Sequence, residues 1–411
     1  MISINKHILP NGLRVLHSKD STTNMVAVNL LYNVGARDEQ PDKTGFAHLF
    51  EHLMFGGSVN VPDFDGPLQK AGAENNAWTN NDITNYYISI PAENLETAFW
   101  LESDRMLELD FSQKSLDTQK NVVIEEFKQR NLNQPYGDLQ MLLRPLTYKV
   151  HPYQWCTIGK DPSHIANATL DEVKDFFYRY YAPNNAILSV VGNIEFEEVV
   201  RLAEKWFGSI PARDVKPKAI PLEPVQTEAR FLKVERDVPA NLICKAYHMP
   251  DRLNENYAVC DLISDLLSNG NSARLYRSLV QELKLFSEIN VYVSGDIDEG
   301  LLHVKGKLNE GISLEMADDA IVAEISKLLT EPISDYEMEK VKNKYESNHV
   351  FSELNYLNKA TNIAYYELLN QAEDINSEVE KYRAVTAKQV KQIAGMLFRP
   401  ENSSTLYYCK K

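Results

Sequence analysis

The sequence predicts an α+β protein with two related domains, each an antiparallel-rich β-sheet with helices packed on one face. The chain has 411 residues, enough for two or more domains with sizeable cores. Residues 26–34 and 186–191 are apolar and rich in β-branched side chains, as in strands, and 86–90 alternates as a half-buried strand would. Residues 171–180 and 197–207 have helical periodicity and acidic residues near their starts.

An internal repeat provides the evidence for two related halves. In both copies a helix-like run is followed by a turn and a β-rich segment. Identical residues recur 217 positions later: Thr169, Val173, Lys174, Pro183 and Asn185 return as Thr386, Val390, Lys391, Pro400 and Asn402. Two unrelated helix–turn–strand units are the alternative interpretation. The repeat predicts domains at 1–213 and 226–411. They are joined by a linker at 214–225, within a stretch interrupted by Pro211, Pro217, Pro221 and Pro224.

His48, Glu51 and His52 form an H-x-x-E-H pattern in a segment that we expect to be helical. On a helix the two histidines, four residues apart, lie on the same face, and Glu51 lies beside them. The alternative is an amphipathic helix with histidines on a partly wet face. The surrounding apolar residues favour a metal site, because buried imidazoles and carboxylates need partners. The order of residues is the inverzincin zinc signature.

A third ligand is predicted from the helical phase of residues 116–130. Glu126 follows Val122 and Val123 by four and three residues, which places it near an apolar face, whereas Glu125 lies nearer the wet face. A carboxylate on an apolar stripe is costly unless it is paired or binds a metal. Two histidines and one glutamate leave a fourth zinc position open, as in catalytic sites. We therefore expect one Zn²⁺ per chain, held by His48, His52 and Glu126.

Ordered stretches along nearly the whole chain resemble the pitrilysin–insulysin peptidases, in the short branch related to the mitochondrial processing peptidase beta subunit. They are residues 11–15, 35–39, 43–45, 76–79, 86–87, 122–126, 151–153, 181–185 and 191–193. The resemblance implies two such domains per chain, two chains around a chamber, and Glu126 as the downstream ligand. It also implies that Asn76, Ala77, Trp78 and Thr79 form an edge strand beside the zinc, to which an extended peptide adds. An ordinary edge strand is the alternative.

The chain departs from the family pattern in two places. Gln119 stands where the family commonly has a second glutamate that is hydrogen-bonded into the site, and we expect this change to tune the site. Val280 and Ser287 stand where self-sufficient members carry an Arg and a Tyr that reach the substrate. A shifted alignment brings Arg277 to the Arg position but leaves Lys284 at the Tyr position. The resemblance therefore implies a related partner subunit that supplies the Arg and Tyr, or else a homodimer.

Composition argues against several classes of partner. The net charge of −15 disfavours nucleic acid and anionic membranes, and no stretch reaches the roughly 18 apolar residues of a membrane span. The N-terminus lacks a signal-peptide pattern, and the four cysteines are scattered without paired spacing. We therefore expect free thiols and a cytoplasmic protein.

The expected function is a zinc-dependent endopeptidase that acts on extended or unfolded peptides with a partner subunit. Glu51 would act as the general base, accepting a proton from the attacking water and delivering it to the leaving amine. Two alternatives stay open. One is a non-catalytic assembly or peptide-binding subunit that retains a zinc site, which has no need of Glu51. The other is a peptide-binding module with a structural zinc, which a carboxylate-containing set of three ligands disfavours.

Overall fold

The computed structural model describes residues 1–216 and 218–411, so Pro217 of the predicted linker lies outside the described residues. The chain forms two compact units. The first contains Met1–Gln129, Trp155–Ile220 and Val350–Ser377, and the second contains Arg130–Gln154, Pro221–His349 and Glu378–Lys411. The division at Ile220 and Pro221 falls inside the predicted linker. The units differ from the predicted continuous domains because each takes one short segment from the other half of the chain.

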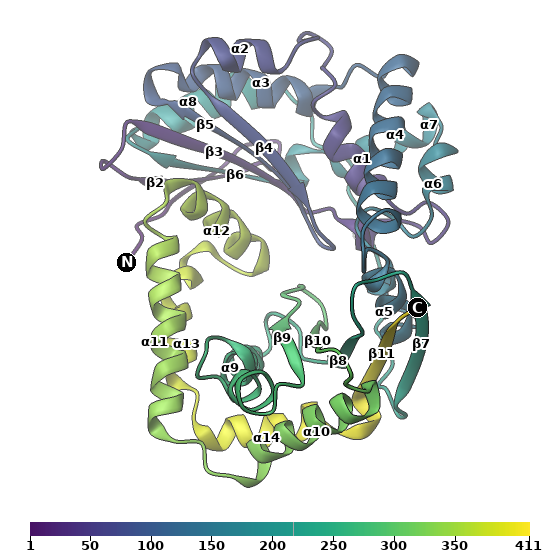
Figure 1. Ribbon diagram of the computed structural model, residues 1–411. Helices are drawn as coiled ribbons and strands as arrows, with labels where there is room; N and C mark the ends of the chain where they lie inside the picture. The colour runs from purple at the N-terminus through teal and green to yellow at the C-terminus, as the bar shows by residue number, and fades with distance from the viewer. Residues whose placement is uncertain (217) are drawn as a thin grey trace. The chain divides into compact units, whose positions relative to one another are not determined.

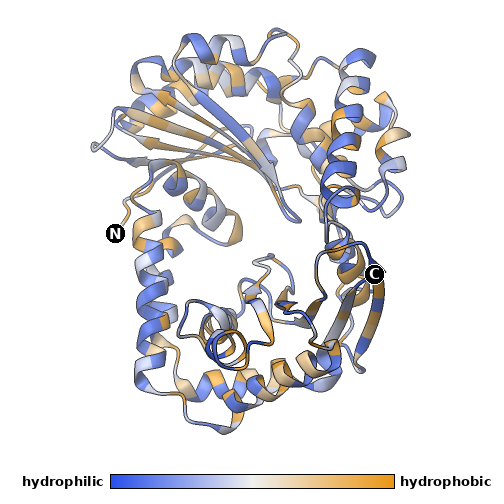
Figure 2. Cartoon of the chain, in the orientation of Figure 1, coloured by the Kyte–Doolittle hydropathy of each residue, from blue (hydrophilic) through white to orange (hydrophobic). Residues whose placement is uncertain are grey.

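The first unit contains a six-stranded sheet in the order β1-β2-β6-β3-β5-β4. Neighbouring strands are antiparallel except β2 and β6, which are parallel. The strands are β1 (Asn5–Ile8), β2 (Arg14–Lys19), β3 (Met25–Tyr32), β4 (Glu74–Thr79), β5 (Thr84–Pro91) and β6 (Ala186–Gly192). The central strands β3 and β6 are buried almost throughout and are mostly hydrophobic, whereas the edge strand β4 is mostly hydrophilic (Figure 2). Burial on both faces explains why these two strands read as continuous apolar runs.

Both faces of this sheet are covered by helices (Figure 1). On one face lie α1 (Phe46–Leu53), α3 (Leu95–Leu107), α4 (Gln113–Phe127), α7 (Leu170–Tyr180) and α8 (Phe196–Phe207), with the short α2 (Asp65–Lys70) and α6 (Pro162–Ala166) beside them. On the other face lies α12 (Tyr356–Leu369), whose Ala360, Ile363 and Ala364 pack with residues of β2, β3 and β6. The first layer agrees with the prediction. The second layer comes from the C-terminal half of the chain, and the sequence did not predict it.

The second unit contains a five-stranded sheet in the order β7-β11-β8-β10-β9, with β7 and β11 parallel. The strands are β7 (Arg230–Arg236), β8 (Leu242–His248), β9 (Phe286–Val293), β10 (Leu301–Leu308) and β11 (Ser403–Lys410). One face is covered by α9 (Tyr257–Ser268), α10 (Leu314–Thr330), α13 (Glu378–Ala384) and α14 (Ala387–Leu397). The other face is covered by α5 (Leu139–Thr147), which comes from the N-terminal half. The remaining long helix, α11 (Asp335–Ser352), has residues in both units.

The predicted repeat is present in both units. The order β2-β6-β3-β5-β4 in the first sheet matches β7-β11-β8-β10-β9 in the second, including the position of the parallel pair. Both α7 and α14 begin with a capping box whose first residue is a threonine. After these helices, the side-chain amide of Asn185 donates to Tyr180 O at 2.8 Å, and that of Asn402 donates to Leu397 O at 2.8 Å. The α+β fold class of two related sheets is therefore confirmed.

Candidate metal centre

The helix that carries the H-x-x-E-H pattern begins at a specific backbone turn. Gly45, at the N-cap of α1, has φ +91°, a left-handed conformation that favours glycine. Glycine has no side chain to accept the first N–H groups of the helix. The buried Glu39 carboxylate does this instead, accepting from Gly45 N at 2.9 Å and Ala47 N at 2.8 Å. Burial raises the pKa of Glu39 to about 8, and the two N–H donors oppose that shift.

The apolar residues of α1 fix which way its polar residues point. Leu49, Phe50 and Leu53 are buried in the core of the first unit. His48 and His52 lie together, with ring centroids 4.8 Å apart and ring planes nearly perpendicular. Because both histidines lie on a helix that is anchored by its apolar face, their imidazoles are held close to each other.

Glu126 lies in the last turn of α4, a helix that begins with an N-cap hydrogen bond from Ser115 N to Ser112 Oγ. Its side chain is 19% exposed, whereas that of Glu125 is 61% exposed and pairs with Lys128. The predicted difference between the two glutamates is therefore present. Val123 is buried as expected, but Val122 is exposed, so the apolar stripe is narrower than the sequence indicated.

The three predicted ligands converge. Glu126 Oε2 lies 3.6 Å from His48 Nε2 and 3.4 Å from His52 Nε2. The ligand atoms of the three side chains all lie within 4.8 Å of one another, and no other such group of three occurs among residues 1–216 and 218–411. Tetrahedral zinc with bonds of about 2.0–2.1 Å separates its ligands by about 3.3–3.4 Å. The donor set and its spacing therefore fit Zn²⁺, and the assignment of each residue as a ligand stays a prediction.

Glu51 is held by the strand that the sequence singled out. Thr79 Oγ1 donates a hydrogen bond of 2.7 Å to Glu51 Oε2. Thr79 is the last residue of β4, which contains the predicted Asn76–Thr79 segment and ends the sheet order. The family resemblance implied that this strand lies beside the zinc site, but the contact with Glu51 was not predicted. Gln119 lies two turns before Glu126 on α4 and is half-buried.

The positions of the missing Arg and Tyr belong to the second unit. Val280 lies in the π-helical segment Tyr276–Glu282 and packs against the core of that unit. Ser287 lies in β9 and its hydroxyl donates to Lys307 O at 3.2 Å. Arg277 is exposed and lies 3.6 Å from Glu282. Neither Val280 nor Ser287 can supply the cationic or phenolic donor that the family pattern has there.

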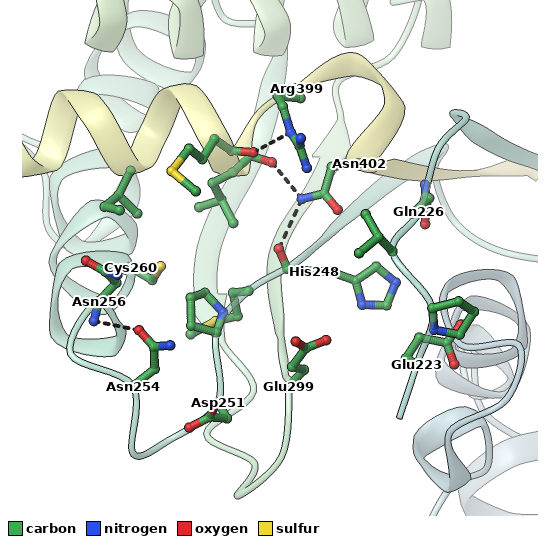
Figure 3. Close-up of a pocket in the computed structure, with 17 residues that line it drawn as sticks. Glu223, Gln226, His248, Asp251, Asn254, Asn256, Cys260, Glu299, Arg399 and Asn402 are labelled. Atoms are coloured by element: carbon green, nitrogen blue, oxygen red, sulfur yellow. Dashed lines mark hydrogen bonds between the residues drawn. The ribbon is translucent and has the colours of Figure 1, made fainter. Parts of the chain in front are cut away.

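A cavity of about 280 Å³ lies in the second unit, between the end of β8, α9 and α14 (Figure 3). Asn402 lines this cavity, and its side-chain amide donates a hydrogen bond to His248 O at 3.0 Å. The Glu223 carboxylate, which also lines the cavity, accepts from the backbone N–H groups of residues 149–151. The cavity lacks a group of three metal-binding side chains within the described residues, so it is not a second centre of the His48 type.

No helix in the described ranges combines the length and hydropathy that crossing a membrane requires. None of the four cysteines, all of which lie in the described part of the chain, forms a disulfide bond, in agreement with their scattered spacing.

Comparison with known proteins identifies the family. The insulinase (peptidase family M16) model matches residues 14–158, and the peptidase M16 inactive domain model matches residues 167–345. The chain is 30% identical over 407 residues to the zinc protease PqqE of Helicobacter pylori, covering 97% of this chain and 91% of that protein. It is 24% identical over 406 residues to the uncharacterized zinc protease YmxG of Bacillus subtilis, covering 98% of each.

Solved structures agree with this assignment. The crystal structure of a protease from Helicobacter pylori superposes with a TM-score of 0.93 at 29% identity, covering 99% of this chain and 100% of that one. A peptidase M16 inactive domain from Pseudomonas fluorescens superposes with a TM-score of 0.88 at 17% identity, covering 100% of this chain and 98% of that one. At this identity the similarity shows only that the two chains share a fold. The predicted resemblance is confirmed: the chain belongs to peptidase family M16, the pitrilysin-like zinc proteases.

Proposed function

We propose that this chain is the zinc-bearing catalytic subunit of an endopeptidase that hydrolyses peptide bonds in extended or unfolded peptides. The observation that carries the proposal is the convergence of His48, His52 and Glu126 beside Glu51. With zinc bound, this arrangement would provide three ligands, an open fourth position and an adjacent carboxylate, as metal-assisted hydrolysis requires.

Each residue then has a distinct role. His48, His52 and Glu126 would hold zinc, which when bound polarises a peptide carbonyl and makes water more acidic. Glu51 accepts the proton of the attacking water and delivers it to the leaving amine. The open edge of β4 binds the peptide main chain, which gives affinity with little dependence on sequence.

Partner dependence is part of the proposal. Transition-state donors that the family places in the second half are absent at Val280 and Ser287. A related subunit would supply an Arg and a Tyr to the site, or a second copy of this chain would complete it. The expected cytoplasmic location stays a prediction.

A non-catalytic peptide-binding subunit is the second candidate. It is favoured by the match of residues 167–345 to the M16 inactive domain model. The hydrogen bond from Thr79 that holds Glu51 favours the catalytic candidate over this one, because a subunit that only binds peptides has no use for a carboxylate beside the metal.

Cleavage of an unstructured peptide by the zinc-loaded chain, with and without a chelator, tests the proposal. Glu51→Gln should keep zinc and lose most turnover, because general-base catalysis contributes about 10²–10⁴-fold. Glu126→Gln should weaken zinc binding, whereas Glu125→Gln, its exposed neighbour, should not. Retained turnover in Glu51→Gln would refute the base assignment. Full zinc occupancy after His48→Ala or His52→Ala would refute the ligand set.

A silent wild-type chain that binds zinc would be tested again together with a related subunit that carries the Arg and Tyr. Cleavage only in the pair would support the partner-dependent form of the proposal. Peptide binding without cleavage in the pair would favour the non-catalytic candidate.

A further inference from the structure

The contact between Thr79 and Glu51 joins the predicted base to the predicted substrate strand. Thr79 Oγ1 lies 2.7 Å from Glu51 Oε2, and a hydroxyl donor of this kind restricts the rotamer of the carboxylate. Glu51 has a flexible side chain on α1, while Thr79 is a β-branched residue with a stiff χ1 at the end of a paired strand. The stiffer residue therefore sets the position of the more flexible one.

The main chain of Thr79 faces the open edge of the sheet. Ala77 N donates to the side-chain oxygen of Asn76 at 2.8 Å, so the polar main-chain groups of Ala77 point away from β5. Successive residues of a strand alternate the side to which their N–H and C=O groups point. Thr79, two residues on, presents its main chain to the same edge as Ala77. A peptide added to that edge would therefore pair beside the residue that holds Glu51.

The strand end and the helix are themselves joined through the loop that precedes α1. Ala36 N donates to Asn80 O at 3.1 Å and Arg37 N donates to Asn81 O at 2.8 Å. Arg37 also lies 3.0 Å from the buried carboxylate of Asp82. The approach is close enough to need glycine at Gly35, because a Cβ there would lie 2.5 Å from the Asn81 carbonyl oxygen. This loop continues to Glu39, which caps α1, so the turn after β4 and the start of α1 are held in one hydrogen-bonded frame.

We propose that Thr79 is a positioning residue that fixes the Glu51 carboxylate relative to a peptide paired on β4. This inference rests on the proposed function. Thr79 does not bind metal and does not move a proton; its hydroxyl keeps Glu51 oriented toward the group whose proton it accepts. A general base must lie within hydrogen-bond reach of that proton, so loss of the hydroxyl lowers the fraction of productive orientations.

Acetohydroxamate provides a test that does not depend on turnover. It chelates zinc and gives up its N-hydroxyl proton to a nearby base, so its affinity for the zinc-loaded chain reports how well Glu51 is placed. Calorimetric titration should show that Thr79→Val weakens binding about three- to tenfold, which is the net effect of losing one ordinary hydrogen bond. Thr79→Ser, which keeps the hydroxyl, should bind within about twofold of the wild type.

Controls separate positioning from general damage. Thr330→Val removes an exposed hydroxyl that donates to Ser326 O on α10 and should leave affinity unchanged. Zinc content should be equal in all these variants. In a Glu51→Gln background, adding Thr79→Val should cause no further weakening, because the two changes remove the same interaction. Wild-type affinity in Thr79→Val, or equal weakening with and without Glu51, would overturn the inference.

The cleavage assay distinguishes this inference from the proposed function. With an active chain or pair, Thr79→Val should lower kcat about tenfold while KM stays unchanged. A rise in KM alone would overturn the inference, because Thr79 would then act only as part of the peptide-binding strand. The wild-type chain could fail to cleave peptides both alone and with a partner, while the Thr79 variants bind acetohydroxamate as expected. That result would count against the proposed function but would support the positioning of Glu51 by Thr79.

Discussion

Replacing Arg105 is the sharpest available test of how the first unit is held together. Arg105 and Glu102, on α3, are 1% and 0% exposed and form a two-pronged ion pair. The guanidinium carbon also lies 4.4 Å from the ring centroids of both Phe64 and Tyr86. Arg105→Met removes the charge and its stacking but leaves Glu102 buried. Such an unpaired buried charge destabilises a protein by about 3–5 kcal/mol.

The size of this loss should depend on pH. Burial raises the pKa of Glu102, and Arg105 opposes that shift, so removing Arg105 raises the pKa further. A carboxyl with a raised folded-state pKa is protonated in the fold at a pH where the unfolded chain has released its proton. Stability of Arg105→Met therefore falls as pH rises above the unfolded value of about 4. We expect a smaller difference from wild type at pH about 5 than at pH about 8.

The assay is urea unfolding followed by tryptophan fluorescence. All four tryptophans, at positions 78, 100, 155 and 206, belong to the first unit, so the signal reports that unit alone. Adding Glu102→Leu to Arg105→Met should recover most of the loss, since an apolar replacement of a buried pair is often neutral. A double variant less stable than Arg105→Met, or a loss that does not change with pH, would refute the assignment of the loss to an unpaired Glu102.

Three further predictions concern stability. The Lys359 ammonium holds the pKa of Asp20 down at about 2, so the pair stabilises the fold above the unfolded pKa of about 4 and this is lost as pH falls toward 2. Lys359→Met should therefore reduce the free energy of unfolding by about 1–2 kcal/mol near neutral pH, and the difference should shrink in acid. Asn185→Ala and Asn402→Ala should each destabilise by about 1–3 kcal/mol, measured by urea unfolding. Only Asn185→Ala should shift the unfolding transition seen by tryptophan fluorescence, because the tryptophans lie in the first unit and Asn402 lies in the second. A shift in both variants would contradict independent unfolding of the two units. Glu39→Gln should lower the thermal midpoint measured above pH about 8, where Glu39 is ionised, because one of the two N–H groups at the start of α1 then loses a carboxylate acceptor. The expected loss is about 1–3 kcal/mol, and an unchanged midpoint at that pH would contradict this role.

The parts of the site that depend on local periodicity could be predicted from the sequence. His48, Glu51 and His52 share one helical turn, and Glu126 differs from Glu125 by helical phase alone, so spacing was enough to choose them. The hydrogen bond from Thr79 to Glu51 could not be predicted in this way. It depends on where the end of β4 meets α1, which is set by the pairing of β4 with β5 and by the loop at Gly35.

For a similar reason, the sequence could not predict that each half of the chain contributes a helix to the sheet formed by the other half. The repeat at Asn185 and Asn402 is local, because each asparagine closes a corner with the helix five residues earlier. An amphipathic segment such as α5 or α12 shows that it has an apolar face but not which sheet that face covers. Tertiary packing decides this, and it places α12 on the first sheet and α5 on the second.

The two related units also show why the candidate metal centre is in the first one. Helices α1 and α9 follow β3 and β8, strands that hold the same place in the two sheet orders. The third, sixth and seventh residues of α1 are His48, Glu51 and His52. The corresponding residues of α9 are Val259, Leu262 and Ile263, all buried in the core of the second unit. Histidines introduced at these positions of α9 would be buried polar groups without partners. The same helix position in the two related units therefore carries core side chains in the second unit and the candidate zinc ligands in the first.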